Sequence, residues 1–448
     1  MPGAEPPGGP EPDTIAAIAT PAGRGAIGIV RASGPQAPAI ARRVLGRLPE
    51  SRVATRCAAR DAAGEVLDEG LALYFPAPHS YTAEDILEFQ GHGGMVVLHS
   101  VLAAFLDAGA RLAEPGEFTR RAFLNGRMDL AQAEAVADLI DAASAQAARS
   151  ALRSLSGKFS DAIRALVAQL VELRALTEAS LDFPEEEVDA LHREDAAGRL
   201  ARLRDALDDV VSRSTEGSLL RDGVYVVLAG RPNVGKSSLL NRLAGEERAI
   251  VTAIPGTTRD ALREIISIDG VPLTLVDTAG LRAAADEAER LGVERTHREI
   301  GQADLLIAVF DAASQDRSLP VAPAAAAARI DVYNKVDLIP GFALPPGGHR
   351  AVAVSAKTGA GIDSLRQAIL DAAGWRSHGE SVFLARERHL RALREASVRL
   401  DAAAQQLGRW ELFAEELRLA QQALGAITGE VSSDDLLGEI FARFCIGK

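Results

Sequence analysis

Short apolar runs separated by glycine-containing turns characterise the chain from residue 13 to residue 127. Ile27–Val30 and Leu71–Phe75 have the length and composition of strands, and the apolar spacing of Met95–Leu106 predicts a helix. We therefore expect a mixed α/β domain in this part of the chain. Residues 1–12 are rich in proline and glycine, which favours a disordered extension.

From residue 128 to about residue 214 the pattern is helical. Apolar residues recur at intervals of three or four from Leu152 to Leu173, which predicts one long amphipathic helix. Phe183-Pro184 is expected to end that helix, and a further amphipathic helix is expected over Asp195–Ser212.

The helical pattern resumes after residue 378 and continues to residue 448. Leucines from Leu390 to Leu407 predict one helix, and Phe413–Ile427 predicts another. Ser432 and Ser433 are expected to cap a last helix. The residues that this helix is expected to turn inward are Leu436, Leu437, Ile440, Phe441 and Phe444.

Between the two helical blocks, residues 215–378 predict a nucleotide-binding domain. Val224–Ala229 predicts a buried strand and Ser238–Leu243 a helix, and the Gly-Arg-Pro-Asn-Val-Gly-Lys-Ser sequence of Gly230–Ser237 between them is typical of a phosphate-binding loop. Because neither helical block alone contains many helices, we interpret the two blocks as one helical domain with the nucleotide domain inserted. Two independent helical domains in series are the alternative.

Composition and charge limit the class of protein without identifying its chemistry. The length of 448 residues suggests about three domains, and no apolar run approaches the ~18 residues of a membrane span. Two cysteines, Cys57 and Cys445, exclude a disulfide framework and fit the reducing cytoplasm. The net charge of −13 weighs against a protein that coats nucleic acid, although a local basic patch or an RNA delivered by a partner stays possible.

The phosphate-binding loop and two later motifs predict where the phosphates and Mg²⁺ would bind. Lys236 would neutralise the β- and γ-phosphates, and the Ser237 hydroxyl would hold Mg²⁺. Asp277-Thr278-Ala279-Gly280 follows an apolar strand, so Asp277 would hold Mg²⁺ through water and the Gly280 N–H would contact the γ-phosphate. Thr257-Thr258, within the segment 252–260, would act as a switch whose threonine ligates Mg²⁺ only when the γ-phosphate is present.

Asn334-Lys335-Val336-Asp337 predicts guanine as the base. The Asp337 carboxylate can accept hydrogen bonds from the N1–H and 2-amino groups of guanine, a pair that adenine lacks. The motifs follow one another in the order typical of a GTPase, each beside a predicted strand, so we expect GTP as the substrate. The residues expected to bind it are Asn233, Val234, Gly235, Lys236, Ser237, Ser238, Thr252, Ala253, Ile254, Pro255, Gly256, Thr257, Thr258, Asp277, Thr278, Ala279, Gly280, Asn334, Lys335, Val336, Asp337, Ser355, Ala356 and Lys357.

Two positions bear on how hydrolysis would proceed. Leu281 follows Gly280 where many GTPases carry a glutamine that orients the attacking water. Glu289 is a candidate for this task, and a solvated charge in an acidic run is its other interpretation. The amide oxygen of Asn233 could help to coordinate a monovalent cation, or the residue could simply stabilise the turn.

Further motifs make the chain resemble the MnmE (TrmE) family of tRNA modification GTPases over essentially its full length. The C-terminal Cys-x-Gly-Lys behind a GTPase domain is the most specific of them. The stretches that carry the resemblance are Asp13–Ile15, Gly23–Gly25, Arg31–Gly34, Glu88–Gly94, Pro115–Phe118, Asn125–Leu130 and Phe444–Lys448.

The resemblance implies an N-terminal folate-binding domain, a helical domain and an inserted Ras-like GTPase domain. It also implies a homodimer formed through the N-terminal domain, and a heterotetramer with the FAD-dependent partner MnmG (GidA). Together these proteins add an aminomethyl or carboxymethylaminomethyl group at C5 of the wobble uridine of certain tRNAs. The one-carbon unit comes from a tetrahydrofolate in its 5-formyl or methylene form.

The resemblance also assigns roles to residues that match its motifs. Glu289 would activate the attacking water and Cys445 would be the functional cysteine. Ser237 and Thr258 would hold Mg²⁺. The residues matching the folate site are Arg31, Glu88, Arg127 and Lys448, and those matching the K⁺ site are Asn233, Thr252, Ile254 and Thr257.

One stretch departs from the family pattern. Ser318–Arg329 consists mostly of proline and alanine, and Asp331 and Tyr333 place polar groups in the strand expected before Asn334. The departure concerns a local helix and the strand register and leaves guanine binding intact. Two other functions stay open at this point, a GTP-switched ribosome-assembly factor and a folate-binding regulatory scaffold with a vestigial GTPase.

Overall fold

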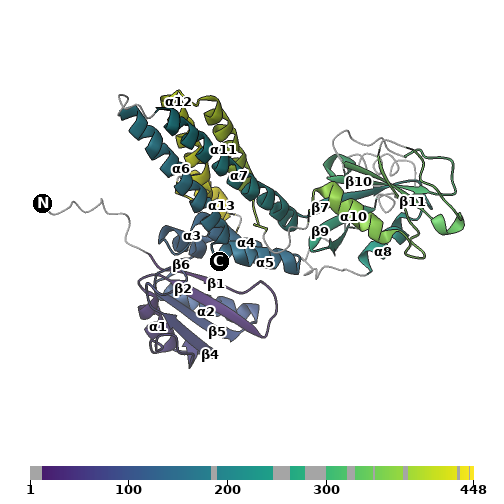
Figure 1. Cartoon of the computed structure of the whole chain (residues 1–448). Coiled ribbons are helices and arrows are strands. Elements are labelled where there is room, and N and C mark those ends of the chain that lie inside the picture. Colours follow the sequence, from purple (N-terminus) through teal and green to yellow (C-terminus); the bar gives the residue numbers. More distant parts are fainter. Residues whose placement is uncertain are drawn as a thin grey trace. The chain divides into compact units, whose positions relative to one another are not determined.

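The structure, a computed structural model, describes residues 13–182, 189–245, 263–277, 299–319, 328–346, 349–376, 382–430, 434–442 and 444–447. The chain forms two compact units, and Figure 1 labels their helices and strands. The first contains the chain up to Ala137 and the segment from Thr428 onward, and the second extends from Asp138 to Ile427. The three-domain division expected from the sequence stays a prediction.

A six-stranded sheet with strand order β3-β4-β5-β2-β1-β6 forms the centre of the first unit. Apolar residues of α1 and α2 pack on one of its faces, against Val30 and Phe89 among others, and confirm the α/β character expected there. Residues of opposite parity, such as Arg31 and Glu88, belong to the other face. The elements are β1 (Ile15–Ile18), β2 (Ile27–Ser33), α1 (Ala37–Leu45), β3 (Thr55–Arg60), β4 (Val66–Phe75), β5 (Ile86–His92), α2 (Met95–Asp107) and β6 (Arg111–Leu112).

The described part of this unit contains three further helices, α3 (Glu117–Leu124), most of α4 (Leu130–Ile140) and α13 (Asp434–Ala442). The inward positions predicted for the last helix are confirmed, because four of the five are buried and Leu436 packs against the same cluster. Their neighbours are Leu130, Ala133 and Ala137 of α4. The last helix therefore packs against α4, which lies in the first of the two predicted helical blocks.

Among the described residues, five helices form the helical part of the second unit: α5 (Ala145–Leu155), α6 (Lys158–Asp182), α7 (Asp189–Asp222), α11 (Glu387–Gln405) and α12 (Trp410–Thr428). The single long helix predicted from Leu152 to Leu173 was wrong, because the chain breaks between α5 and α6 at Gly157 (φ +90°). The two helical blocks do pack together. Arg174 Nη1 of α6 donates to Gln421 Oε1 of α12 at 2.7 Å, and Arg204 of α7 pairs with Asp401 of α11.

The nucleotide segment contains a second six-stranded sheet, with strand order β12-β11-β10-β7-β9-β8. Its strands are parallel except for the β8–β9 pair. The strand predicted at Val224–Ala229 is β7, and the helix after the phosphate loop is α8. The elements are β7 (Val224–Ala229), α8 (Lys236–Ala244), β8 (Arg263–Ile268), β9 (Val271–Asp277), β10 (Leu305–Asp311), β11 (Ala328–Asn334), the 3₁₀ turn η2 (Val336–Leu338), β12 (Arg350–Ala353) and α10 (Ile362–Ala373).

The polar residues of β11 have local partners. Asp331 Oδ1 accepts from Arg329 Nε at 2.6 Å, and the Tyr333 ring stacks on Phe310 with a centroid distance of 5.5 Å. β11 pairs in regular register with β10, with Asn334 opposite Asp311. The departure from the family pattern therefore leaves the strand intact and Asn334 at its carboxyl end.

Among the helices that the structure describes, none combines the length and the apolar character needed to cross a membrane.

Candidate functional site

The phosphate-binding loop connects the carboxyl end of β7 to the first turn of α8. Lys236 is 4% exposed, and its Nζ donates to the carbonyls of Gly230 and Arg231, both at 2.9 Å. The lysine thereby closes the loop on itself. The backbone N–H groups at the start of α8 and the lysine charge together form an anion-binding cradle.

Two glycines of this loop cannot carry a side chain. A Cβ on Gly230 would lie 2.4 Å from the carbonyl oxygen of Val309. Gly235 has φ +94°, and a Cβ there would lie 2.3 Å from Asn334 Nδ2. The second contact brings the phosphate loop directly against the predicted guanine-binding motif, so the two motifs are packed as parts of one site.

Ser237 and Asp277 meet where Mg²⁺ is expected. Ser237 Oγ donates to Asp277 Oδ2 at 2.9 Å, and Asp277 is 1% exposed at the end of β9. A hydroxyl and a carboxylate are hard oxygen donors, which suit Mg²⁺. The two residues fit the expected role, in which Ser237 holds the ion and Asp277 holds it through water.

The base-binding side is built from the ends of β11 and β12. Asn334 is 2% exposed, donates from Nδ2 to the Val234 carbonyl at 2.9 Å and accepts from Ala356 N at 3.0 Å. Ser355 Oγ donates to Asp337 Oδ1 at 2.6 Å. Asn334 therefore connects the phosphate loop to the loop after β12, and Ser355 orients the carboxylate expected to recognise guanine.

Asn233 lies beside a polar cavity of about 240 Å³. Its backbone has φ +64°, and its carbonyl accepts from Lys335 Nζ at 2.7 Å. The same Nζ lies 2.7 Å from Asp311 Oδ2. Burial acts to raise the pKa of Asp311, but the hydrogen bond from Lys335 outweighs it and the pKa lies below its ordinary value. Lys335 is thus fixed between the phosphate loop and β10.

Several predicted site residues lie outside the described residues, so their placement stays a prediction. They belong to the switch segment, the end of the Asp277 motif, the water-activating position and the C-terminus. These residues are Thr252, Ala253, Ile254, Pro255, Gly256, Thr257, Thr258, Thr278, Ala279, Gly280, Glu289 and Lys448.

The N-terminal unit brings Arg31 and Glu88 into direct contact. They are opposite each other in β2 and β5, with Arg31 Nε and Nη2 at 2.8 and 2.7 Å from Glu88 Oε1. The guanidinium of Arg31 also lies over the rings of Tyr81 and Phe118, 5.8 and 5.7 Å from their centroids. A charged pair with two aromatic rings can bind a flat, polar heterocycle.

Helix α3 links this pair to two further predicted site residues, Arg127 and Cys445. Phe118 lies in its first turn, and Arg127, which is exposed, follows its end. The Gly116 N–H, just before the helix, donates to the Cys445 carbonyl at 3.4 Å. Arg31 and Glu88 are therefore in contact. Cys445 lies at the start of α3, and Arg127 lies just past its end.

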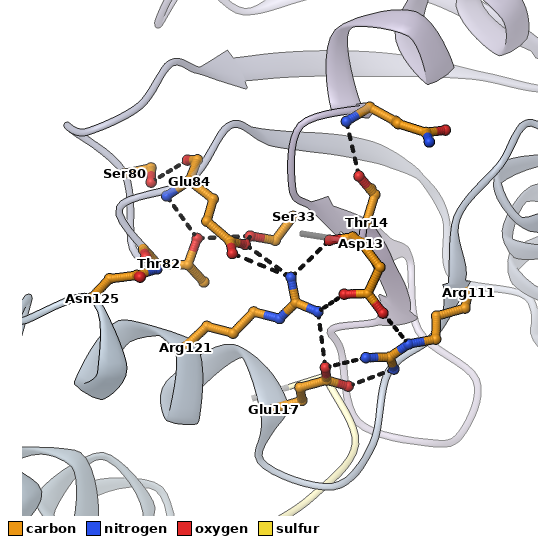
Figure 2. A network of polar contacts seen from close by, with 11 residues as sticks. Asp13, Thr14, Ser33, Ser80, Thr82, Glu84, Arg111, Glu117, Arg121 and Asn125 are labelled. Carbon is orange, nitrogen blue, oxygen red and sulfur yellow. Dashed lines mark hydrogen bonds and ion pairs between the residues drawn. The ribbon is translucent and has the colours of Figure 1, made fainter. Parts of the chain in front are cut away.

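A polar network fixes α3 on the N-terminal sheet (Figure 2). Arg121 donates to the carboxylates of Asp13, Glu84 and Glu117, and Arg111 forms a forked pair with Glu117 at 2.9 and 2.6 Å. Burial acts to raise the pKa of Glu117, but hydrogen bonds from Arg111, the Glu114 N–H and Arg121 keep it below its ordinary value. The network positions Phe118 over Arg31.

Sequence reasoning did not identify Tyr81 and Phe118 as site residues. Phe118 stands in the Pro-Gly-Glu-Phe stretch that carried the family resemblance, but nothing in that pattern indicates a ring over Arg31. Tyr81 lies 50 residues from Arg31 in the sequence and offers no signal. Burial raises the pKa of its hydroxyl, with the hydrogen bond to Thr119 and the charge of Arg31 acting in the opposite direction.

Two family profiles together match residues of both units of the chain. The profile of the MnmE helical domain matches residues 130–445, and that of the GTP-binding protein TrmE N-terminus matches residues 14–127. A tRNA modification GTPase MnmE of Azoarcus sp. (strain BH72) is 58% identical over 445 residues, which cover 98% of each chain. The same protein of Aromatoleum aromaticum is 56% identical over 443 residues, again covering 98% of each chain. That of Thiobacillus denitrificans is 56% identical over 442 residues, covering 98% of this chain and 99% of the relative.

Proposed function

The chain belongs to the MnmE family of tRNA modification GTPases, and from this premise we propose that it is a K⁺-stimulated GTPase acting on the wobble uridine of certain tRNAs. It would work with the FAD-dependent partner MnmG and install an aminomethyl or carboxymethylaminomethyl group at C5. GTP hydrolysis would drive a conformational change of the dimer rather than bond formation on uridine.

The observation that carries the GTPase part is the assembly of Lys236, Ser237 and Asp277 with Asn334 around one loop. These groups would bind the phosphates, Mg²⁺ and guanine of GTP. A vestigial GTPase would have no need for a buried lysine and a buried aspartate in hydrogen-bonding contact with the loop and its serine. This geometry therefore argues against a purely scaffolding role.

The Arg31–Glu88 pair supports a tetrahydrofolate site in the N-terminal unit. Folate contains a pterin ring and carboxylates, so it suits an arginine and a carboxylate with aromatic neighbours. Arg127 and Lys448 would contribute further positive charge. A ribosome-assembly factor would have no use for such a site, which favours the modification pathway over that alternative.

The open face of the N-terminal sheet supports a homodimer. Register places Ile29, Gln90 and Leu71 in one row across β2, β5 and β4. Ile27 and Leu71 are 66% and 43% exposed on this face. Apolar side chains next to the Arg31–Glu88 pair suit a second copy of the chain, which would then border the folate site.

Nucleoside mass spectrometry of tRNA from a deletion strain tests the function. The C5-modified wobble uridine should disappear in the deletion and return with the wild-type gene. Restoring a Lys236→Ala variant should not return it, because that variant lacks the phosphate-binding charge. Wobble uridines that stay modified without the gene would refute the proposal.

A further inference from the structure

An arginine-rich segment stands out in the N-terminal unit of this acidic protein. Residues 37–60 contain six arginines and a single acidic residue, Glu50, whereas the whole chain has a net charge of −13. The segment comprises α1, the loop that follows and β3. Its arginines are Arg42, Arg43, Arg47, Arg52, Arg56 and Arg60.

Packing turns these arginines outward. Val44 and Leu45 of α1 and Ala59 of β3 are buried in one cluster, and Leu48 and Cys57 pack against it. The inward face of the segment is thus apolar. All six arginines are exposed. Arg42 and Arg43 lie on α1 and Arg47 just follows it, whereas Arg56 of β3 is opposite Leu71 and belongs to the open face of the sheet. We call the exposed arginines of this segment the arginine edge.

The arginine edge is held together by contacts that leave its charge in place. Arg47 Nη2 donates to the Arg56 carbonyl at 2.8 Å, which links α1's end to β3. Arg60 Nη1 donates to the Gly64 carbonyl at 2.9 Å, and Arg52 donates to the His79 carbonyl. A carbonyl accepts a hydrogen bond without neutralising the guanidinium, and each guanidinium has further N–H donors.

Ion pairing distinguishes this surface from the other arginines of the unit. Arg111 and Arg121 are surrounded by carboxylates in the network of Figure 2. In the arginine edge, Arg56 pairs with Glu69 at 2.8 Å, and the other five have no carboxylate within 4.0 Å among the described residues.

Three neighbouring acidic residues have hydrogen-bond or ion-pair partners. Asp61 accepts from the backbone N–H groups of Ala63 and Glu65 in the β3–β4 turn. Asp85 accepts from the Ala77 N–H, and Glu69 is paired with Arg56. Glu50 is the one acidic residue within the segment. Within residues 37–60, six positive charges therefore stand against one negative charge.

We propose that the arginine edge binds the phosphodiester backbone of the tRNA substrate. An RNA approaching a protein of charge −13 is repelled by most of its surface, so docking requires a local positive surface with unsatisfied donors. Guanidinium groups match phosphate oxygens in geometry and charge. The contacts would position the tRNA without reading its bases.

The position of the α1 arginines is compatible with the dimer proposed above. α1 packs on the face of the sheet opposite to Arg31 and Glu88. A second copy that covered the open face would therefore leave the outer side of α1 accessible. This inference rests on the proposed function in one respect only, namely that tRNA is the substrate.

The test measures binding of a full-length wobble-uridine tRNA transcript to the full-length protein by fluorescence anisotropy across a series of KCl concentrations. We expect Arg43→Glu/Arg47→Glu to weaken binding about tenfold or more at low salt, because two phosphate contacts become repulsive. The slope of log affinity against log salt concentration should decrease in magnitude by about two. GTP hydrolysis without tRNA should be unchanged, because the phosphate loop lies in the other unit.

A matched control reverses two exposed arginines of the helical part, Arg164→Glu/Arg418→Glu. It changes the net charge equally, yet both residues already have acidic neighbours, Asp161 and Glu415. We expect less than about a twofold loss of affinity. Arg43→Lys/Arg47→Lys should retain binding and salt dependence, because lysine keeps the positive charge at both positions.

The proposal is overturned if Arg43→Glu/Arg47→Glu binds tRNA with unchanged affinity and salt dependence, or loses no more than the control. Reduced binding of an acidic protein partner together with unchanged tRNA binding would also overturn it and assign the surface to protein. Failure of the proposed function would appear separately, as modified wobble uridines in the deletion strain.

Discussion

Arg386 donates a hydrogen bond from Nη2 to Asp138 Oδ1 at 2.7 Å, across 248 positions of the sequence. Arg221 Nε donates to the same oxygen at 3.1 Å. Arg221 lies in the last turn of α7, shortly before β7 begins, and Arg386 is the residue before α11. One carboxylate therefore fixes the chain where it enters and where it leaves the nucleotide-binding segment.

We expect Asp138→Ala to lower the free energy of unfolding by on the order of 3 kcal/mol, because two guanidinium groups lose a buried acceptor. The side chains of Asp138 and Arg386 are 7% and 13% exposed, so solvent would compensate little. Urea titration followed by far-UV circular dichroism measures the change.

Asp209→Ala is the matched control, because Asp209 is 63% exposed and pairs with Arg213 one helical turn away. Its loss should cost less than about 1 kcal/mol. Equal effects of the two substitutions would show that Asp138 does not fix the ends of the inserted segment.

The network around Arg121 predicts a loss of stability in acid. Burial acts to raise the pKa of Asp13 and Glu117, yet the hydrogen bonds from Arg121 and Arg111 outweigh it and both pKa values are lowered. A carboxyl group with a lowered pKa stabilises the fold above its unfolded pKa, and the stabilisation is lost as the pH falls through the folded pKa. Stability should therefore begin to fall below about pH 4.5, the ordinary value for glutamate.

Glu117→Gln tests whether protonation of the Glu117 carboxylate causes this loss of stability in acid. The variant should have a lower thermal midpoint than the wild type at pH 7, and the difference should shrink as the pH falls toward 3, because both proteins then lack the carboxylate. A difference that stays constant over this range would contradict an electrostatic role for Glu117.

Local patterns were sufficient to predict that the described phosphate-loop, Asp277 and Asn334 motifs follow strands of one sheet. The apolar run of β7, the glycine loop and the helix after it are adjacent in sequence, and strand ends place Asp277 and Asn334 at one edge of a parallel sheet. The chemistry of each motif therefore followed from short stretches. The contact of Gly235 with Asn334 could not be predicted in this way, because it depends on the packing of two loops about 100 residues apart.

Features that depend on distant packing were missed. The break at Gly157 interrupts an apolar spacing that continues on both sides, so periodicity alone cannot reveal it. The two helical blocks were expected to form one domain, but the specific pairing of α13 with α4 depends on burial of Phe441 and Phe444 against a segment some 300 positions earlier. Tyr81 and Phe118 over Arg31 are likewise set by the tertiary fold, and no local signal precedes them.

The position of Asn233 in the phosphate loop predicts a response to K⁺. Lys335 fixes its carbonyl, and its amide oxygen is expected to join phosphate oxygens around a monovalent cation that stabilises transition-state charge. Replacing Na⁺ by K⁺ should raise the rate of GTP hydrolysis about tenfold or more and promote self-association in the GTP state. Steady-state phosphate release and light scattering in the two salts measure both effects.

Asn233→Ala should remove the K⁺ response while GTP affinity in Na⁺ stays near that of the wild type. Arg231→Ala, at another exposed position of the same loop, should retain the response. Identical hydrolysis and self-association of the wild type in Na⁺ and K⁺ would eliminate the cation site.

Cys445 should be required for tRNA modification and dispensable for GTP hydrolysis. It is exposed and lies at the start of α3, in the unit that contains Arg31 and Glu88, whereas the phosphate loop belongs to the other unit. A serine has nearly the same size but a far less acidic and less nucleophilic side chain, so Cys445→Ser removes the thiol chemistry and keeps the packing. Nucleoside mass spectrometry of tRNA and phosphate release by the same variant should separate the two activities. Cys57→Ser, at the half-buried cysteine of β3, should retain both, and modified wobble uridines in cells that carry only Cys445→Ser would show that the thiol has no part in the reaction.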